Sequence, residues 1–183
     1  VVSASAAAQW PAKPIRVINP FVAGGGLDAL LRPLARKMGE SLKQGLVIDN
    51  RPGANGMIGT DIAAKAPPDG YTILAGTTGA LSMNAAVYPK LPFDPIKDFA
   101  PISNFAASAF VLALHPWVPA NNIAEFIALA KSRPGELTYG TFGIASSSHL
   151  AAELFDMMAG TKTLHVPYKG IAQSVAALLT GEI

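Results

Sequence analysis

Short runs of β-branched residues alternate with helical stretches along this chain, and this alternation constrains the fold more than any other feature. In the first half the pattern predicts strands and helices in turn: strands at 15–19, 46–50 and 71–75, and helices at 27–42, 58–66 and 82–87. The sequence Pro-Pro-Asp-Gly at 67–70 ends the second of these helices. Such an order predicts βαβ units around a mainly parallel sheet, which is an α/β fold.

The second half repeats the plan. It predicts strands at 110–114 and 138–141, helices at 123–131, 147–158 and 175–179, and the entry to a further strand at 181–183. The irregular, proline-rich stretch at 91–101 separates the two halves. We therefore expect two lobes, 9–106 and 107–183, of which the second is truncated.

Composition excludes several classes of partner. The net charge is only +2 and no run of Lys or Arg forms a stripe, so nucleic acid is not an expected partner. Pro, Gly or a charged residue interrupts every apolar stretch before the ~18 residues needed to cross a bilayer, so the chain is not expected to be membrane-embedded.

The first eight residues differ from the rest, because they are small, apolar and rich in alanine. They are typical of the end of a secretory signal peptide with a cleavage site after Ala8, although a disordered alanine-rich tail is the alternative. The absence of cysteine excludes disulfides and thiolate metal sites, and it is compatible with a bacterial periplasm.

Three strand-to-helix loops combine glycine with hydroxyl groups or backbone N–H groups, at 23–28, 76–82 and 143–148. In parallel α/β sheets, ligands bind beyond the carboxyl ends of the strands, where helix N-termini present unpaired N–H groups. Together the loops predict a binding protein that holds a small organic anion. Taken singly, each loop is equally consistent with serine or threonine caps and glycine turns.

The first loop also fits a second hypothesis. Gly24, Gly26 and Ala29 match the dinucleotide fingerprint G-x-G-x-x-A, and Asp49 ends the next strand where a ribose-binding carboxylate would lie. This alternative is a nicotinamide-dependent oxidoreductase. Two details oppose it: residues 20–23 separate the strand from the first glycine, and Asp28 places a negative charge where the pyrophosphate would bind.

Catalytic and metal-binding patterns are weak. Neither G-x-S-x-G nor G-K-[ST] occurs, and His149 with Glu153, one helical turn apart, lacks the H-E-x-x-H context of a zinc site. We interpret His149 as a locally packed or hydrogen-bonded residue and 146–148 as donors and caps. No catalytic residue, metal or cofactor is predicted.

In eight ordered segments the chain resembles the Bug family of periplasmic solute receptors, which serve tripartite tricarboxylate transporters. The segments are WPAKPIR at 10–16, NPF at 19–21, NRPGA at 50–54, AKAPPDGYT at 64–72, YPKLPFDP at 88–95, KDFAP at 97–101, HLAAELF at 149–155 and HVPYKG at 165–170. The resemblance is to an N-terminal fragment of such a receptor, since family members are considerably longer.

The resemblance implies a two-lobed Venus-flytrap receptor, of the periplasmic-binding-protein type, that delivers a carboxylate to inner-membrane permease subunits and has no catalytic activity. It also implies a ligand-binding set drawn from the three loops and one further segment: Phe21, Gly24, Gly25, Asp28, Thr77, Thr78, Ser82, Ser146, Ser147, Ser148, His149 and Tyr168.

The chain departs from the family in two respects. Val22 and Ala23 replace the usual proline-rich lead-in to the glycines, and an acidic residue that lines the cleft in family members belongs to the part that this chain lacks. A third hypothesis is therefore an interaction or sensory module with a vestigial pocket.

Overall fold

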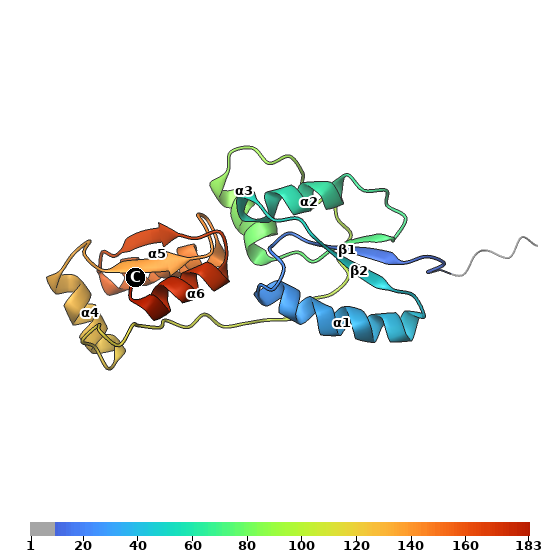
Figure 1. The fold of residues 1–183 in the computed structure, drawn as a ribbon. Helices are drawn as coiled ribbons and strands as arrows, with labels where there is room; N and C mark the ends of the chain where they lie inside the picture. Colours follow the sequence, from blue (N-terminus) through green and yellow to red (C-terminus); the bar gives the residue numbers. More distant parts are fainter. Residues whose placement is uncertain (1–9) are drawn as a thin grey trace, which may run out of the picture. The chain divides into compact units, whose positions relative to one another are not determined.

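The computed structural model describes residues 10–183, so the predicted end of a signal peptide at 1–8 lies outside the described residues. The chain divides into two compact units (Figure 1). The first runs to Thr77 and includes Pro92–Phe99, and the second combines Thr78–Leu91 with Ala100–Ile183. The assignment of 9–106 and 107–183 to two lobes of a receptor stays a prediction.

The first unit contains a three-stranded parallel sheet with the order β2-β1-β3. Its strands are β1 (Ile15–Asn19), β2 (Leu46–Asn50) and β3 (Thr72–Leu74). Helix α1 (Gly26–Leu42) covers one face and α2 (Met57–Ala64), preceded by the short helix η1 (Ala54–Gly56), covers the other (Figure 1). Because β1 is the central strand and lies between both helices, its apolar residues are buried on both faces.

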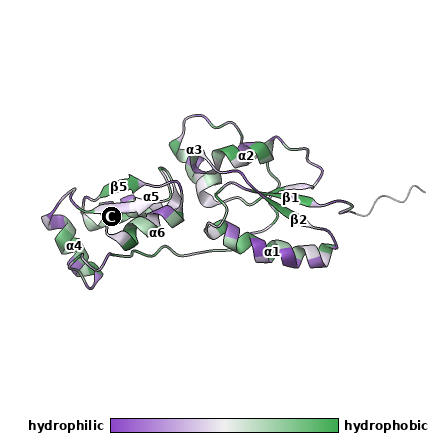
Figure 2. Cartoon of the chain, viewed as in Figure 1, coloured by the Kyte–Doolittle hydropathy of each residue, from purple (hydrophilic) through white to green (hydrophobic). Residues whose placement is uncertain are grey.

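The core between α1 and the sheet is built from apolar residues at helical and strand spacing. Leu27 and Leu31, one turn apart on α1, pack with Val17 of β1 and with Leu46 and Ile48 of β2. Figure 2 shows hydrophilic residues interspersed with apolar ones along α1, as expected for a helix with one buried face.

Helix α2 passes close to the end of β1 at Gly59. A Cβ atom at this position would lie 2.8 Å from the carbonyl oxygen of Arg51 and 2.8 Å from Cα of Pro20. Both atoms belong to the backbone, so only glycine permits this approach.

The second unit contains a parallel pair, β4 (Thr138–Thr141) and β5 (Leu164–Pro167). Its helices are the π-helix η2 (Gly79–Met83), α3 (Asn84–Val87), α4 (Ile123–Ser132), α5 (Ser147–Ala159) and α6 (Ile171–Thr180). Asp156, near the end of α5, accepts hydrogen bonds from Thr161 Oγ1 at 2.6 Å and from the Thr163 backbone N–H at 2.8 Å. These bonds fix the turn that leads into β5.

Most of the predicted elements are present. The strands at 15–19, 46–50 and 138–141 have the predicted bounds, and each predicted helix overlaps a helix of the structure. The predicted strand at 110–114 is wrong, because residues 101–114 adopt no regular structure and Val111 is 87% exposed. A strand needs a partner for its backbone groups, and neither described sheet includes this segment.

The C-terminal half also contains one strand that was not predicted. The prediction missed β5, a four-residue strand that ends in a proline. Gly181 adopts a left-handed conformation and ends α6, and the entry to a further strand at 181–183 stays a prediction.

Candidate ligand-binding site

The first predicted loop lies where the central strand of the first sheet ends and α1 begins. Gly24 has a φ of 75°, the left-handed conformation that glycine adopts without steric cost, and the Gly25 N–H donates to the carbonyl of Val22 at 3.3 Å. The turn directs the N-terminus of the 17-residue helix α1 to the carboxyl edge of the sheet. Helix geometry leaves the N–H groups of the first turn without intrahelical acceptors, so this edge suits an anion.

The buried carboxylate of Asp28 stabilises the loop at 23–28 by hydrogen bonds. Its side chain is 2% exposed and accepts hydrogen bonds from the Gly24 N–H at 2.9 Å, from Arg32 Nε at 2.7 Å and from Asn50 Nδ2 at 3.1 Å. The hydrogen bonds from Arg32 above all, with those from Gly24 and Asn50, outweigh the effect of burial and lower the pKa of Asp28 to about 2. Its carboxylate is thus ionised and engaged within the protein, and its bonds hold the loop that precedes α1. Contact between Asp28 and a ligand stays a prediction.

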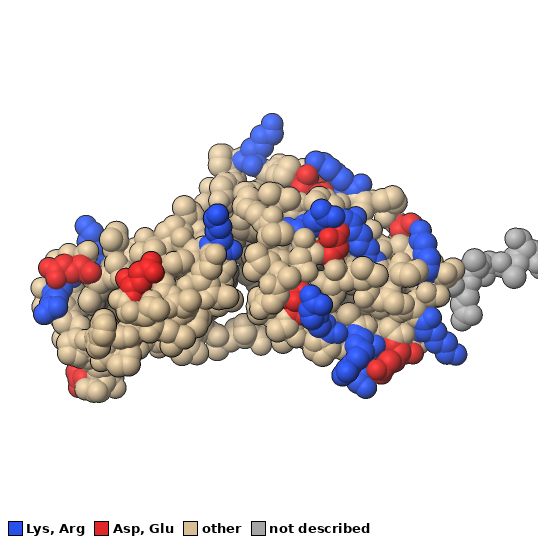
Figure 3. Space-filling model, in the orientation of Figure 1, with Lys and Arg blue, Asp and Glu red and all other residues tan. Residues whose placement is uncertain are grey.

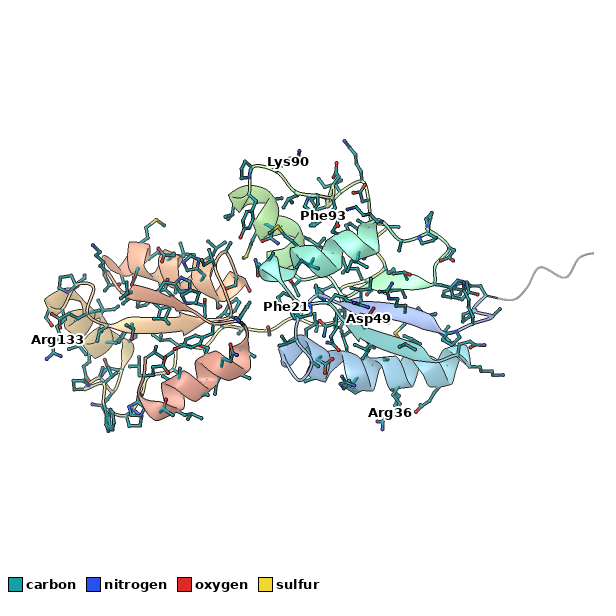
Figure 4. All side chains as sticks on the ribbon, turned by 45° about the horizontal axis from the view of Figure 1, so that its top comes forward. Phe21, Arg36, Asp49, Lys90, Phe93 and Arg133 are labelled. Atoms are coloured by element: carbon teal, nitrogen blue, oxygen red, sulfur yellow. The ribbon has the colours of Figure 1, made fainter. Side chains whose placement is uncertain are left out.

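Two asparagines that the sequence analysis did not select fix Phe21 on both sides. Asn19 Oδ1 accepts the Phe21 N–H at 3.1 Å, and Asn50 Nδ2 donates to the Phe21 carbonyl at 3.2 Å. Figure 4 labels Phe21 where it follows β1. Asn19 and Asn50 are register partners at the ends of neighbouring strands. The sequence feature that could have identified them is an asparagine at the end of each of two mainly apolar strands.

Asp49, which the dinucleotide alternative assigns to a ribose hydroxyl, is engaged in two ion pairs. Its carboxylate accepts hydrogen bonds from Arg16 Nε at 2.8 Å and pairs with Arg51 Nε at 2.8 Å. Burial opposes ionisation of Asp49, but the bonds from Arg16 and Arg51 prevail and lower its pKa. Since successive strand residues point to opposite faces, Asp49 (Figure 4) also points away from Asn50 and the α1 loop.

The second predicted loop is divided between the two units. Thr77 follows β3 in the first unit, and β3 is the direct neighbour of β1, with the Ala75 N–H donating to the Ile18 carbonyl at 2.9 Å. Thr77 and the first loop therefore lie at the same edge of one sheet. Thr78 and Ser82 belong to the second unit, where Thr78 precedes η2 and Ser82 lies exposed within it.

The third predicted loop, at 143–148, follows β4 in the second unit. Ser146 is fully buried and caps α5, because its Oγ accepts the His149 N–H at 3.3 Å and lies 3.1 Å from Ser148 Oγ. Ala145 is buried with a φ of 58°, a strained conformation for a residue with a Cβ atom. The predicted capping role of this loop is confirmed for Ser146.

His149 is hydrogen-bonded by a nearby residue of its own loop, as predicted, but its stacking on a second histidine was not predicted. Its Nδ1 accepts the Ala145 N–H at 3.2 Å and its Nε2 lies 3.5 Å from Glu153 Oε1. Its ring stacks on that of His165, with centroids 3.9 Å apart. The two histidines are 16 positions apart in the sequence, and the parallel pairing of β5 with β4 brings them together.

Thr141 connects His165 to the loop that follows β4. Thr141 Oγ1 lies 2.6 Å from His165 Nε2, and it accepts a hydrogen bond from the Gly143 N–H at 3.2 Å. Burial first, and then the neighbouring His149, lower the pKa of His165 against the opposing influence of Glu153. The neutral form of His165 is favoured, and it helps to fix the loop after β4.

Tyr168 follows β5, beside the end of β4. Its N–H donates to the Thr141 carbonyl at 3.0 Å and its hydroxyl donates to Glu182 Oε1 at 3.0 Å. It lines a cavity of about 420 Å³ in the second unit, together with residues of α6. Tyr168 and the serine loop are therefore at the same edge of the second sheet.

A cavity of about 650 Å³ in the first unit lies along the side of α1 and β2 and away from the glycine turn. Three cationic residues line it, Arg32, Arg36 and Lys43. Figure 3 shows Lys and Arg side chains gathered over α1. None of the predicted site residues lines this cavity.

Within residues 10–183, no three His, Asp or Glu side chains are arranged to hold a metal ion. Over the same range, every helix is too short or too polar to cross a membrane.

Known proteins match this chain in sequence and in structure. The family described as tripartite tricarboxylate transporter family receptor matches residues 30–183. Protein BugT of Bordetella pertussis is 38% identical over 175 residues, which is 95% of this chain and 54% of BugT. The chain thus spans about half the length of the curated relatives it matches.

Two similar proteins of known structure are described with a dicarboxylate, adipate or malate. R. palustris Rpa4515 with adipate has a TM-score of 0.91 and 38% identity, with 95% of this chain and 58% of that chain covered. MatC from Rhodopseudomonas palustris with bound malate has a TM-score of 0.80 and 27% identity, covering 95% and 59%. The α/β fold of periplasmic binding proteins, expected from the sequence, is confirmed. The family match covers most of the chain, and both sheets are parallel with glycine-containing or serine-containing loops after their strands. The protein therefore belongs to the receptor family of the tripartite tricarboxylate transporters.

Proposed function

We propose that this chain is part of a periplasmic receptor that binds a small carboxylate and presents it to inner-membrane permease subunits, without catalysing a reaction. The observation that carries the proposal is the first turn of α1, whose N–H groups lie at the carboxyl edge of the sheet, next to a glycine loop that Asp28 hydrogen-bonds. Adipate and malate, named with two structural neighbours, are both dicarboxylates and support this ligand class.

The residues proposed to bind the ligand form two groups, one in each unit. Phe21, Gly24, Gly25, Asp28 and Thr77 form the group of the first unit. The group of the second unit contains Thr78, Ser82, the loop residues 146–149 and Tyr168. In each unit backbone N–H groups and hydroxyls are the available donors, which is the chemistry that recognises a carboxylate.

The ion pairs of Asp49 oppose the nicotinamide alternative. A carboxylate that already accepts from Arg16 and Arg51 has to break charge-assisted bonds before it binds a ribose hydroxyl. We therefore propose a carboxylate, and no nucleotide cofactor, as the ligand.

Isothermal titration calorimetry of the complete gene product tests this function. The titrants are adipate, malate, citrate and benzoate, with NADH as the comparison. We expect saturable binding of at least one carboxylate and none of NADH. Binding of NADH that is lost in Asp49→Ala, together with no heat from any carboxylate, would overturn the proposal.

Export is tested separately, by fractionating cells that express the complete gene with an epitope tag at its C-terminus. We expect the protein in the periplasmic fraction, shortened at its N-terminus. Retention of the full-length product in the cytoplasm would contradict a periplasmic receptor.

A further inference from the structure

Asn19 is a buried polar residue whose hydrogen-bonding capacity is only partly used. It is the last residue of β1, the central strand of the first sheet, and its side chain is 0% exposed. Its Oδ1 accepts the Phe21 N–H at 3.1 Å. Its Nδ2 has no acceptor among the described residues. A buried amide donor without a partner is rare, because it loses its hydration and gains nothing in return.

The side chain of Asn19 faces the start of α1. Val17, two residues earlier on the same strand, packs against Leu31 of α1, and residues i and i+2 of a strand share a face. Asn50, the register partner of Asn19, sends its own amide to Asp28 in the first turn of α1. The Oδ1 bond to Phe21 turns the Asn19 amide towards the loop at 21–25.

Some backbone N–H groups of this loop have an acceptor within the protein, and others have none. The Gly24 N–H is bound by Asp28 and the Gly25 N–H by the Val22 carbonyl. The N–H groups of Gly26 and Leu27, in the first turn of α1, have no acceptor within the helix. Asn19 Nδ2 is therefore a further donor beneath a helix N-terminus that already favours negative charge.

We propose that Asn19 Nδ2 is a ligand-recognising donor of the anion site, which hydrogen-bonds an oxygen of the carboxylate held at the first turn of α1, directly or through one bound water. This inference rests on the proposed function and names a residue of that site.

The chemistry of the side chain agrees with this role. The NH₂ group of an asparagine side chain is a neutral hydrogen-bond donor. It therefore favours ligands that present an acceptor oxygen over ligands that present an amino group. In a buried position such a bond to a charged oxygen is strong, because water does not compete for the donor. The same residue anchors Phe21, so ligand binding and the shape of the loop are linked through one side chain.

Two substitutions separate the donor from the anchor. Asn19→Asp keeps Oδ1 as the acceptor for the Phe21 N–H but removes the N–H donor. Asn19→Leu keeps a similar volume and removes both functions. If Nδ2 binds the ligand, both variants weaken carboxylate binding by roughly tenfold or more, which is the effect of losing one hydrogen bond to a charged group. If only the anchor matters, Asn19→Leu weakens binding, and Asn19→Asp weakens it only by the repulsion of its added negative charge, which high salt screens.

The measurement is calorimetry on the complete gene product, with adipate or whichever carboxylate the wild type binds. Wild-type affinity for Asn19→Asp overturns the inference and leaves the proposed function intact. Absence of carboxylate binding by the wild type overturns the proposed function itself.

A second measurement needs no variant, which matters if Asn19→Asp fails to fold. In wild-type protein labelled with 15N-asparagine, the side-chain amide signal of Asn19 shifts on saturation with ligand if Nδ2 gains an acceptor. An Asn19 side-chain signal that stays in place at saturation overturns the inference.

Discussion

At the scale of single residues, Asp28 determines the shape of the glycine loop. It joins the Gly24 N–H, the Arg32 guanidinium and the Asn50 amide around one buried carboxylate. The sequence identified Asp28 as either a cap or a ligand contact. Its choice of partners depends on Asn50, which is 22 positions away, and no local pattern encodes that contact.

Asp28→Asn should destabilise the protein in a pH-dependent way. The pKa of Asp28 is lowered from 3.8 to about 2, so its charge stabilises the fold by about 2 kcal/mol at neutral pH. Because the folded-state pKa is the lower one, this contribution is complete above about pH 4 and is lost as the pH falls towards 2. Urea unfolding at pH 7 and pH 3 measures it.

Glu40→Gln is the matched control on the same helix, because Glu40 forms only an exposed pair with Lys37. We expect a change within about 0.5 kcal/mol for this variant. Equal stability of Asp28→Asn and wild type at pH 7 would contradict the role assigned to the buried carboxylate.

His165 should make the second unit sensitive to mild acid. Its pKa is lowered by burial and by His149, so the folded state binds a proton less readily than the unfolded state. The stabilisation is complete above the ordinary histidine pKa of 6.5 and decreases as the pH falls below it. Thermal melts at pH 7.5 and pH 5.5 should show a smaller loss of stability in His165→Gln than in wild type.

His115→Gln is the control for this experiment, since His115 packs on Trp117 outside the cluster. An equal loss of stability in His165→Gln and wild type would show that His165 does not carry the acid sensitivity.

At the scale of helices and strands, the sequence predicts an element correctly where the spacing of its own apolar residues shows which face is buried. Strand 15–19 is apolar because it lies between two helices, and 27–42 is helical because Leu27, Leu31 and Ala35 recur on one face. The segment at 110–114 has the same apolar character but no described partner strand, so its composition alone misled the prediction.

The packing of α2 against β1 yields a prediction at this scale. Gly59→Ala places a Cβ atom 2.8 Å from two backbone atoms, so α2 has to move and the fold loses roughly 1–3 kcal/mol. Chemical unfolding monitored by circular dichroism measures the loss. Gly45→Ala is the control, because no atom lies within 4 Å of its Cβ position. Equal effects of the two substitutions would contradict the close approach.

At the scale of the whole molecule, each unit carries part of the predicted site at the carboxyl edge of a parallel sheet. The sequence located these loops because glycine and hydroxyl residues follow predicted strands. It did not identify the supporting residues Asn19, Asn50 and His165, because their roles arise from pairing between strands that are distant in sequence. Binding of a small carboxylate is the function that we propose for the complete receptor.

The most direct test of this account removes one N–H group from the first turn of α1. Proline is tolerated at the first helical position, and Gly25 already has the extended conformation that a following proline requires. Gly26→Pro therefore deletes a donor while preserving the helix, and Gly26→Ala keeps the donor at a position with no atom within 4 Å of the new Cβ.

Calorimetry of both Gly26 variants, in the complete gene product and with a carboxylate that the wild type binds, provides the measurement. The account predicts that Gly26→Pro weakens binding by roughly tenfold or more, while Gly26→Ala binds as wild type. Wild-type affinity in a folded Gly26→Pro protein would contradict the claim that the first turn of α1 holds the anion.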